Sequence, residues 1–124
     1  MDPVSDMLVA IKNGYMAKKS SVAVPFSKFK QEIAKLLERE NIVGKTTKEN
    51  SHIMIELQYE NQKPKITQIE RISKLGLRVY KKSKNIKRVK GGKGISIVST
   101  SKGLMTGDQA KAKKLGGEII CRIW

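Results

Sequence analysis

The stretch GGKGISIVSTSKGLM, residues 91–105, joins a short β-branched run to a polar turn. Residues 95–98 are mostly apolar and β-branched, which predicts a buried or half-buried strand. Glycines at positions 91, 92, 94 and 103 bracket this strand, and glycine allows positive φ and close approach of another backbone. The strand is followed by three hydroxyls and one ammonium: Ser99, Thr100, Ser101 and Lys102. A tight polar turn on a rigid strand is suited to presenting hydrogen bonds to a partner.

Three interpretations of this turn compete. The first is an ordinary turn, which is polar because turns are polar. The second is nucleophilic catalysis, because Ser99 and Lys102 have the Ser-x-x-Lys spacing of acyl-serine enzymes. That chemistry needs a serine that opens a helix, so that both side chains share a face, whereas Ser99 follows a strand. The third is contact with nucleic acid, and the charge of the surrounding chain favours it.

Charge is distributed unevenly along the 124 residues. The chain has 26 Lys and Arg against 11 Asp and Glu, a net charge of +15, and a pI near 10.1. Residues 1–62 hold 9 basic and 8 acidic side chains, and residues 63–124 hold 17 and 3. No carboxylate lies between Arg71 and Gly107. Charge of one sign predicts a phosphate-binding surface. Its candidate phosphate contacts are Lys84, Lys87, Arg88 and Lys90.

Several classes of protein are disfavoured by the composition. The single cysteine, Cys121, cannot form an internal disulfide, which suits a reducing cytoplasm, and its apolar neighbours predict a free thiol in the core. The single histidine, His52, cannot build a His-rich metal site. No apolar run reaches the ~18 residues of a membrane span, and Asp2 and Asp6 argue against a signal peptide. We therefore expect no metal, cofactor, membrane partner or small-molecule substrate.

The first half of the chain predicts the order α-β-α-β-β. A helix begins at Asp2 and Pro3, carries one apolar stripe, and stops at Gly14. Residues 22–25 form a short extended piece. Ser27 caps a second helix, which ends near Asn41. Its expected buried face is Phe29, Ile33, Leu36 and Leu37. Residues 42–43 then begin a strand, 45–50 form a polar turn, 53–58 alternate as a strand, and 65–71 form a strand that pairs back.

The second half predicts strands around one short helix. Leu77 to Tyr80 alternate as a strand, and residues 81–90 form a basic loop or a short turn of helix. Tyr80 is open to two interpretations, packing in the core or stacking on a base. A Thr-x-x-Gln capping box at Thr106 predicts a helix over 108–115, and 118–124 form the last strand.

Gly116 and Gly117 place Glu118 at the start of that last strand. One interpretation is an ordinary end of the preceding helix. The other is a carboxylate and bare backbone directed at the edge of a base. The predicted fold is α+β with two small lobes, 1–64 with helices and 65–124 basic and mainly β.

Six segments together resemble the bacterial small-subunit ribosomal protein eight family. They run in order and nearly end to end, at residues 2–8, 11–14, 25–30, 76–81, 94–103 and 116–121. The resemblance implies a two-lobed α+β protein of the cytoplasmic small ribosomal subunit that binds the central domain of 16S ribosomal RNA. It also implies help in assembling the subunit platform, contact with neighbouring ribosomal proteins, and repression of the protein's own operon messenger RNA.

The resemblance also implies a set of RNA-binding residues. In that family a Ser-Thr-Ser turn and a Gly-Gly-Glu turn lie side by side against an irregular, partly unpaired RNA helix. Here the predicted set is Ser99, Thr100, Ser101, Lys102, Gly116, Gly117, Glu118, Tyr80 and Lys81, with Ser27, Lys28 and Lys30 from the first lobe. Three positions depart from the family. Leu75 replaces a usual proline, Asn41 a common glycine and Lys93 a common apolar residue, which affects local turns.

The prediction is therefore a structural RNA-binding protein that catalyses no reaction. Lysines and arginines give salt-dependent affinity, and the two turns recognise exposed bases and shape. One alternative is a regulator outside the ribosome that binds messenger RNA or DNA, and a preference for duplex DNA would favour it. The other is an enzyme acting through Ser99 and Lys102, which covalent labelling of Ser99 by an acyl-serine probe would favour.

Overall fold

The computed structural model describes residues 3–124 and divides into two compact units, Met1–Thr67 and Gln68–Trp124. Each unit combines helix with antiparallel sheet, so the predicted α+β class is confirmed. The prediction that the lobes divide after residue 64, with RNA binding concentrated in the later part, stays a prediction. The helix cap expected from Asp2 lies outside the described residues.

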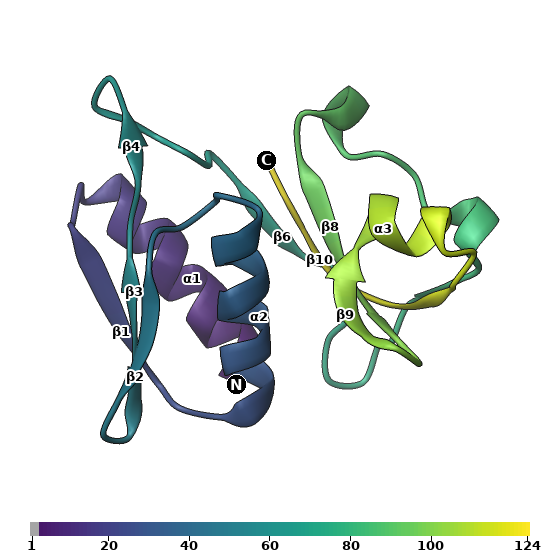
Figure 1. Cartoon of the computed structure of the whole chain (residues 1–124), viewed down its shortest axis with the longest axis horizontal. Coiled ribbons are helices and arrows are strands. Elements are labelled where there is room, and N and C mark those ends of the chain that lie inside the picture. The colour runs from purple at the N-terminus through teal and green to yellow at the C-terminus, as the bar shows by residue number, and fades with distance from the viewer. Residues whose placement is uncertain (1–2) are drawn as a thin grey trace. The chain divides into compact units, whose positions relative to one another are not determined.

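The first unit packs two helices against a three-stranded sheet (Figure 1). Its elements are α1 Pro3–Met16, β1 Ser21–Pro25, α2 Lys28–Arg39, β2 Thr46–Glu49 and β3 His52–Glu56, followed by a small hairpin of β4 Tyr59–Glu60 and β5 Lys63–Pro64. The antiparallel strand order is β1-β3-β2. In β3, buried Ile53 and Ile55 alternate with more exposed neighbours, as their period of two predicts.

The apolar stripe predicted for α1 is confirmed, since Val4, Met7, Leu8 and Ile11 are all buried. The predicted stop at Gly14 is wrong, because the helix continues to Met16. Gly14 is instead a close packing position. A Cβ there would lie 2.5 Å from Val22 Cγ1 and 2.9 Å from Leu57 Cδ1.

Helix α1 ends at Met16, and the turn that closes it has Lys18 in the left-handed region. The Lys19 amide donates to the Gly14 carbonyl and the Lys18 amide to the Tyr15 carbonyl, with Lys18 at φ +58°. This is the Schellman pattern, which usually places glycine at the left-handed position. Helix α2 ends in the same way with Asn41 at φ +61°. Asparagine tolerates this region better than most residues, which explains how it can stand where the resembling family has glycine.

Two predictions for the first unit are wrong. Residues 42–43 form a bend after the helix, and the strand lies instead at β2 Thr46–Glu49, inside the expected turn. Polar residues suit β2 because it pairs with β3 at the edge of the sheet. Phe29 is 37% exposed, and the buried positions of α2 are Lys30, Ile33, Ala34, Leu36 and Leu37.

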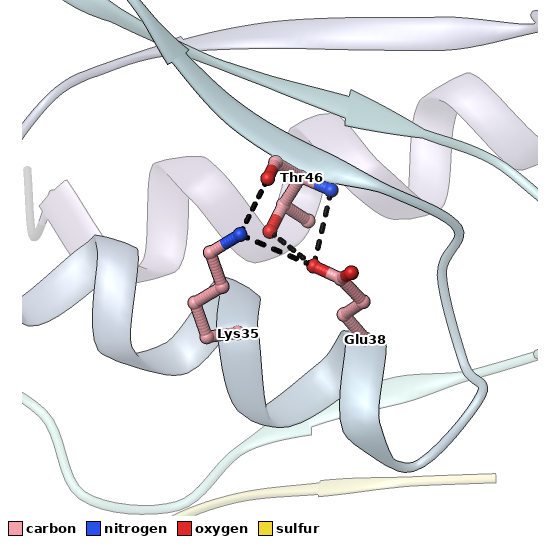
Figure 2. Close-up of polar contacts among 3 residues, drawn as sticks. All are labelled: Lys35, Glu38 and Thr46. Carbon is pink, nitrogen blue, oxygen red and sulfur yellow. Dashed lines mark hydrogen bonds and ion pairs between the residues drawn. The ribbon is translucent and has the colours of Figure 1, made fainter.

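One polar cluster fixes β2 to α2 (Figure 2). The Glu38 carboxylate accepts from the Thr46 hydroxyl at 2.7 Å and from the Thr46 amide at 3.1 Å. The Lys35 ammonium donates to the Thr46 carbonyl at 2.6 Å and pairs with Glu38 at 3.4 Å. The hydroxyl of Thr46, followed by its amide and Lys35, lowers the pKa of Glu38, since each favours the ionised carboxylate.

The second unit is a five-stranded sheet built around its last strand. Its elements are β6 Ile69–Arg71, β7 Tyr80–Lys81, two short 3₁₀ turns, η1 Ser83–Asn85 and η2 Lys90–Gly92, then β8 Ile95–Thr100, β9 Gly103–Thr106, α3 Gly107–Ala112 and β10 Gly117–Ile123. The order is β6-β10-β8-β9, and β7 also pairs with β10. Strand β10 thus joins three other strands, all antiparallel.

Several details of the second unit differ from the prediction. Strand β6 covers only Ile69–Arg71 and pairs with β10 rather than back onto the first unit's sheet. The strand expected over 77–80 is only β7 Tyr80–Lys81, and Leu77 is 61% exposed because it closes a tight turn with Lys74. The capping box at Thr106 is confirmed, but α3 ends at Ala112, before the predicted 115. The two apolar residues of the basic segment 81–90, Ile86 and Val89, are buried and anchor it.

Candidate nucleic-acid interface

Three strands bring most of the predicted site into two rows at one end of the second unit's sheet. In the register of β7, β10 and β8, Tyr80 lies opposite Glu118 and Glu118 opposite Ser99. In the adjacent row, Lys81 lies opposite Gly117 and Gly117 opposite Thr100. Directly opposed residues share a face of a sheet, and successive residues alternate. Tyr80, Glu118 and Ser99 therefore form one face of this sheet end, and we call these three residues the recognition row.

Glycine at positions 116 and 117 is explained by close backbone approach. A Cβ on Gly117 would lie 2.2 Å from the Ser99 carbonyl oxygen, and one on Gly116 would lie 2.6 Å from the Lys81 carbonyl oxygen. Real Cβ atoms do not approach so closely. The two glycines thus allow β10 to pass between its neighbours, and they leave bare backbone at the surface beside the recognition row.

The polar turn after β8 is shorter than predicted. Ser99 and Thr100 belong to the strand, and the hairpin to β9 turns over Ser101 and Lys102 alone, with Gly103 at φ +107°. The Thr100 hydroxyl donates to the Gly103 carbonyl at 2.8 Å and accepts from the Lys102 amide at 3.1 Å. It therefore holds the hairpin. The Ser99 hydroxyl has no hydrogen bond within residues 3–124, so it is available to a ligand.

Glu118 is held by a cation that the sequence prediction did not include. Arg78 donates to the Glu118 carboxylate at 3.2 Å, and the Glu118 side chain is only 17% exposed. The pairing fixes the direction of the carboxylate in the recognition row. The only sequence signal for Arg78 was its place in the basic run, because the pairing of β7 with β10 is not visible in either segment alone.

Tyr80 is 68% exposed, so its alternative role as a core residue is wrong. Beside it lies an open hollow of about 590 Å³. The hollow is lined by Tyr80, Lys81, Lys82, Ser83, Lys114, Gly116 and Gly117. An exposed aromatic ring next to ammonium groups and bare backbone suits a base and its phosphate. Lys114 and Ser83 were not predicted, since they reach the site only through the pairing of β7 with β10.

The predicted phosphate contacts Lys84, Lys87, Arg88 and Lys90 are all exposed. They flank the buried anchors Ile86 and Val89, which hold this irregular segment against the unit. Lys90 differs from the others because its Nζ lies 4.7 Å from the centroid of the Trp124 ring, a cation–π geometry.

The predicted residues of the first unit have different surroundings. The Ser27 hydroxyl caps α2 by accepting from the Lys30 amide at 3.2 Å, so it supports the helix. Lys28 is exposed. Lys30 is only 6% exposed, which leaves little of its surface for a ligand. Of this group, Lys28 is therefore the most accessible cation.

Acyl-serine catalysis, metal binding and membrane-spanning helices were each compared with the described structure. Ser99 lies in a strand and Lys102 in a two-residue turn, so they lack the shared helical face of an acyl-serine enzyme, and that alternative is wrong. Over residues 3–124, no three His, Cys, Asp or Glu side chains are grouped to hold a metal ion. None of the helices described is long and apolar enough to cross a membrane.

Sequence comparisons show which known proteins this chain is similar to. A family model described as ribosomal protein S8 matches residues 2–124. The small ribosomal subunit protein uS8 of Oleidesulfovibrio alaskensis is 46% identical over 123 residues, covering 99% of this chain and 98% of the relative. The uS8 of Vibrio cholerae is 47% identical over 125 residues, covering 98% and 96%. The uS8c of Tetradesmus obliquus is 45% identical over 133 residues, covering 99% and 98%.

Proposed function

Because the chain belongs to the ribosomal protein S8 family, we propose that it is a structural component of the small ribosomal subunit and binds ribosomal RNA. Membership of a ribosomal protein family confirms the prediction that the chain is not an enzyme. The observation that carries RNA binding is the recognition row with bare backbone beside it. It combines an exposed aromatic ring, an unpaired hydroxyl and an oriented carboxylate. These groups suit splayed bases of irregular RNA better than the grooves of a regular duplex.

Electrostatics supports a polyanionic partner for the second unit. Residues 68–124 hold 15 Lys and Arg side chains but only three Asp and Glu. Two of these carboxylates, Glu70 and Glu118, are each already paired with an arginine. The lysines are therefore left for phosphates. In this proposal they supply affinity that falls with salt, and the recognition row supplies selectivity.

The proposal extends to a more specific role. The RNA target is the central domain of 16S ribosomal RNA, and the protein helps to assemble the platform of the cytoplasmic small subunit beside neighbouring ribosomal proteins. A similar fold in its own operon messenger RNA would give the protein a repressor function. The support for these steps is family membership together with the shape-reading chemistry of the recognition row.

A competition binding assay with a salt titration tests the proposal. The targets are an RNA hairpin with an irregular internal loop, the same hairpin fully paired, and duplex DNA of matched sequence. Ser99→Ala removes a hydroxyl that makes no internal hydrogen bond. We expect it to reduce the preference for the irregular hairpin by roughly 1–3 kcal/mol. Lys84→Ala, the charge control, should weaken binding to all three targets alike and reduce the salt slope by about one.

Two results would contradict the proposal, and a third would contradict only the role given to the recognition row. Equal, steeply salt-dependent binding of the wild type to all three targets would mean that the basic surface binds phosphates without reading RNA shape. A preference for duplex DNA would favour a regulator outside the ribosome. Equal losses for Ser99→Ala on all targets would refute the specific role given to the recognition row.

A further inference from the structure

A second, smaller hollow lies in the unit Gln68–Trp124, with a volume of about 300 Å³. Its floor is apolar and includes Ile72, Ile86 and Ile119. Ile86 and Ile119 belong to the buried cluster under α3, and Ile72 packs against it, so the floor is part of the rigid core. A volume this small is at the lower end for ligand sites and suits one ring system rather than a large ligand.

The rim of this hollow is cationic and polar. Lys81, Lys87 and Arg122 line it. Arg122 already donates to Glu70, whereas neither lysine has a carboxylate partner within residues 3–124. Asn85 adds a side-chain amide that makes no hydrogen bond to any described residue. The hollow therefore offers an apolar floor, a hydrogen-bonding amide and two unneutralised ammonium groups.

Lys81 connects this hollow to the interface already described. It lies opposite Gly117 in β10, beside the recognition row. Because side chains alternate along β10, Gly117 and Ile119 share a face, and Lys81 lies on that face with the isoleucine floor. The hollow therefore lies on the face opposite the recognition row, and the consecutive residues Tyr80 and Lys81 of β7 connect the two faces.

We infer that this hollow receives one unstacked nucleotide of the bound RNA. The flat base lies on the isoleucine floor, its edge meets the Asn85 amide, and its phosphate lies between Lys81 and Lys87. Bases in loops and bulges of RNA can be splayed out in this way, whereas paired bases cannot. The inference rests on the proposed RNA binding and adds a separate subsite to it.

Blocking the hollow tests the inference. Asn85→Trp places a large ring at its wall, and Asn85→Ala is the matched variant that leaves it open. Both act at an exposed residue whose side chain makes no internal hydrogen bond. The probe is the irregular hairpin, used intact and as a series in which each unpaired nucleotide in turn becomes abasic. Thermal unfolding of each variant checks that it is folded.

We expect one abasic RNA to bind the wild type about tenfold more weakly than the intact hairpin, as for loss of one base contact. Asn85→Trp should bind the intact hairpin about tenfold more weakly and no longer distinguish that abasic RNA, while Asn85→Ala should still distinguish it. A second pair removes charge instead. Lys87→Ala should lose more affinity than Lys84→Ala, because Lys84 is exposed in the same segment but does not line the hollow.

Two outcomes would overturn the inference and leave the proposed function standing. In the first, the wild type prefers the irregular hairpin, but Asn85→Trp distinguishes the abasic RNA as the wild type does. In the second, adenosine or uridine 5′-monophosphate shifts the methyl NMR signals of Ile72, Ile86 and Ile119 while no abasic RNA loses affinity, which would make this a site for free nucleotides. If the wild type shows no preference for the irregular hairpin, both the inference and the proposed function fail.

Discussion

Gly117→Ala is the substitution whose effect follows most directly from the geometry of the interface. The added Cβ would lie 2.2 Å from the Ser99 carbonyl oxygen and 2.9 Å from its carbonyl carbon. Ordinary van der Waals contact begins at 3.4 Å, so β10 and β8 must separate locally by about 1 Å. The neighbouring atoms are backbone and cannot move aside as a flexible side chain would. Overpacking of this kind costs roughly 1–3 kcal/mol.

Urea denaturation measures the cost, and RNA binding measures its consequence. We expect the free energy of unfolding to fall by about 2 kcal/mol with little change in the denaturant slope. Binding to the irregular hairpin should weaken by about tenfold even where the variant is fully folded, because the recognition row is opened. Gly44→Ala is the control. The added Cβ would lie 3.1 Å from the Glu56 Cβ, and Gly44 belongs to the first unit, not to the unit that carries the recognition row.

One result would refute this reasoning. If Gly117→Ala changed the free energy of unfolding by less than about 0.5 kcal/mol and left the RNA affinity unchanged, glycine would not be required by the Ser99 carbonyl. A large loss of stability without loss of affinity in the folded protein would refute only the link between strand spacing and recognition.

Four further predictions concern stability and reactivity. Lys18→Gly should raise the free energy of unfolding by roughly 0.5–1 kcal/mol in urea because it relieves φ +58°, while Lys18→Ala should give no gain. Leu75→Pro should raise it by about 0.4–1 kcal/mol, since Leu75 precedes Gly76 at φ +84° in a tight turn, the position that proline favours, and a thermal melt measures this. The lowered pKa of Glu38 means that its contribution to stability is present above the ordinary value of 4.5 and is lost as pH falls through the lowered value, so Glu38→Gln should flatten the decline of unfolding free energy in acid. Burial raises the pKa of the Cys121 thiol to about 12, so iodoacetamide at pH 8 should label it only as fast as the protein unfolds, and labelling at the rate of a free thiol would contradict this.

Local signals explain the parts of the fold that the sequence predicted correctly. The spacing of Met7, Leu8 and Ile11 in α1 and the Thr106 capping box are each contained in a few consecutive residues. The alternation of Ile53 and Ile55 in β3 is equally local. Such patterns depend on periodicity and backbone capping, which need no knowledge of the rest of the chain.

The wrong predictions depend on partners distant in sequence. Strand β2 is polar because it lies at an edge, and its Thr46 is fixed by Glu38 of α2. Gly14 resembled a helix stop, but its role is to admit Val22 and Leu57. In each case a tertiary contact decides what the residue does, and intrinsic propensity is a weak guide there.

The family resemblance predicted the residues of the candidate site and the side-by-side placement of its Ser-Thr-Ser and Gly-Gly-Glu turns, but not the rest of the arrangement. The sequences around Tyr80, Ser99 and Glu118 do not indicate that Tyr80 and Ser99 lie on either side of Glu118 in one row. They also do not indicate that Arg78 pairs with the Glu118 carboxylate. The hollow over Ile119 was not predicted, because its floor and rim come from five separate parts of the second unit.

Strand β10 is made after every strand that it joins. On a growing chain, β6, β7 and β8 are complete before Gly117–Ile123 exist, and until then β7 has no strand partner. The surface that carries Tyr80, Glu118 and Ser99 therefore forms in a single late step of synthesis. An unfinished chain has the lysines that attract RNA but lacks the row that we propose reads it, so under this proposal selective binding requires a chain that includes Gly117–Ile123.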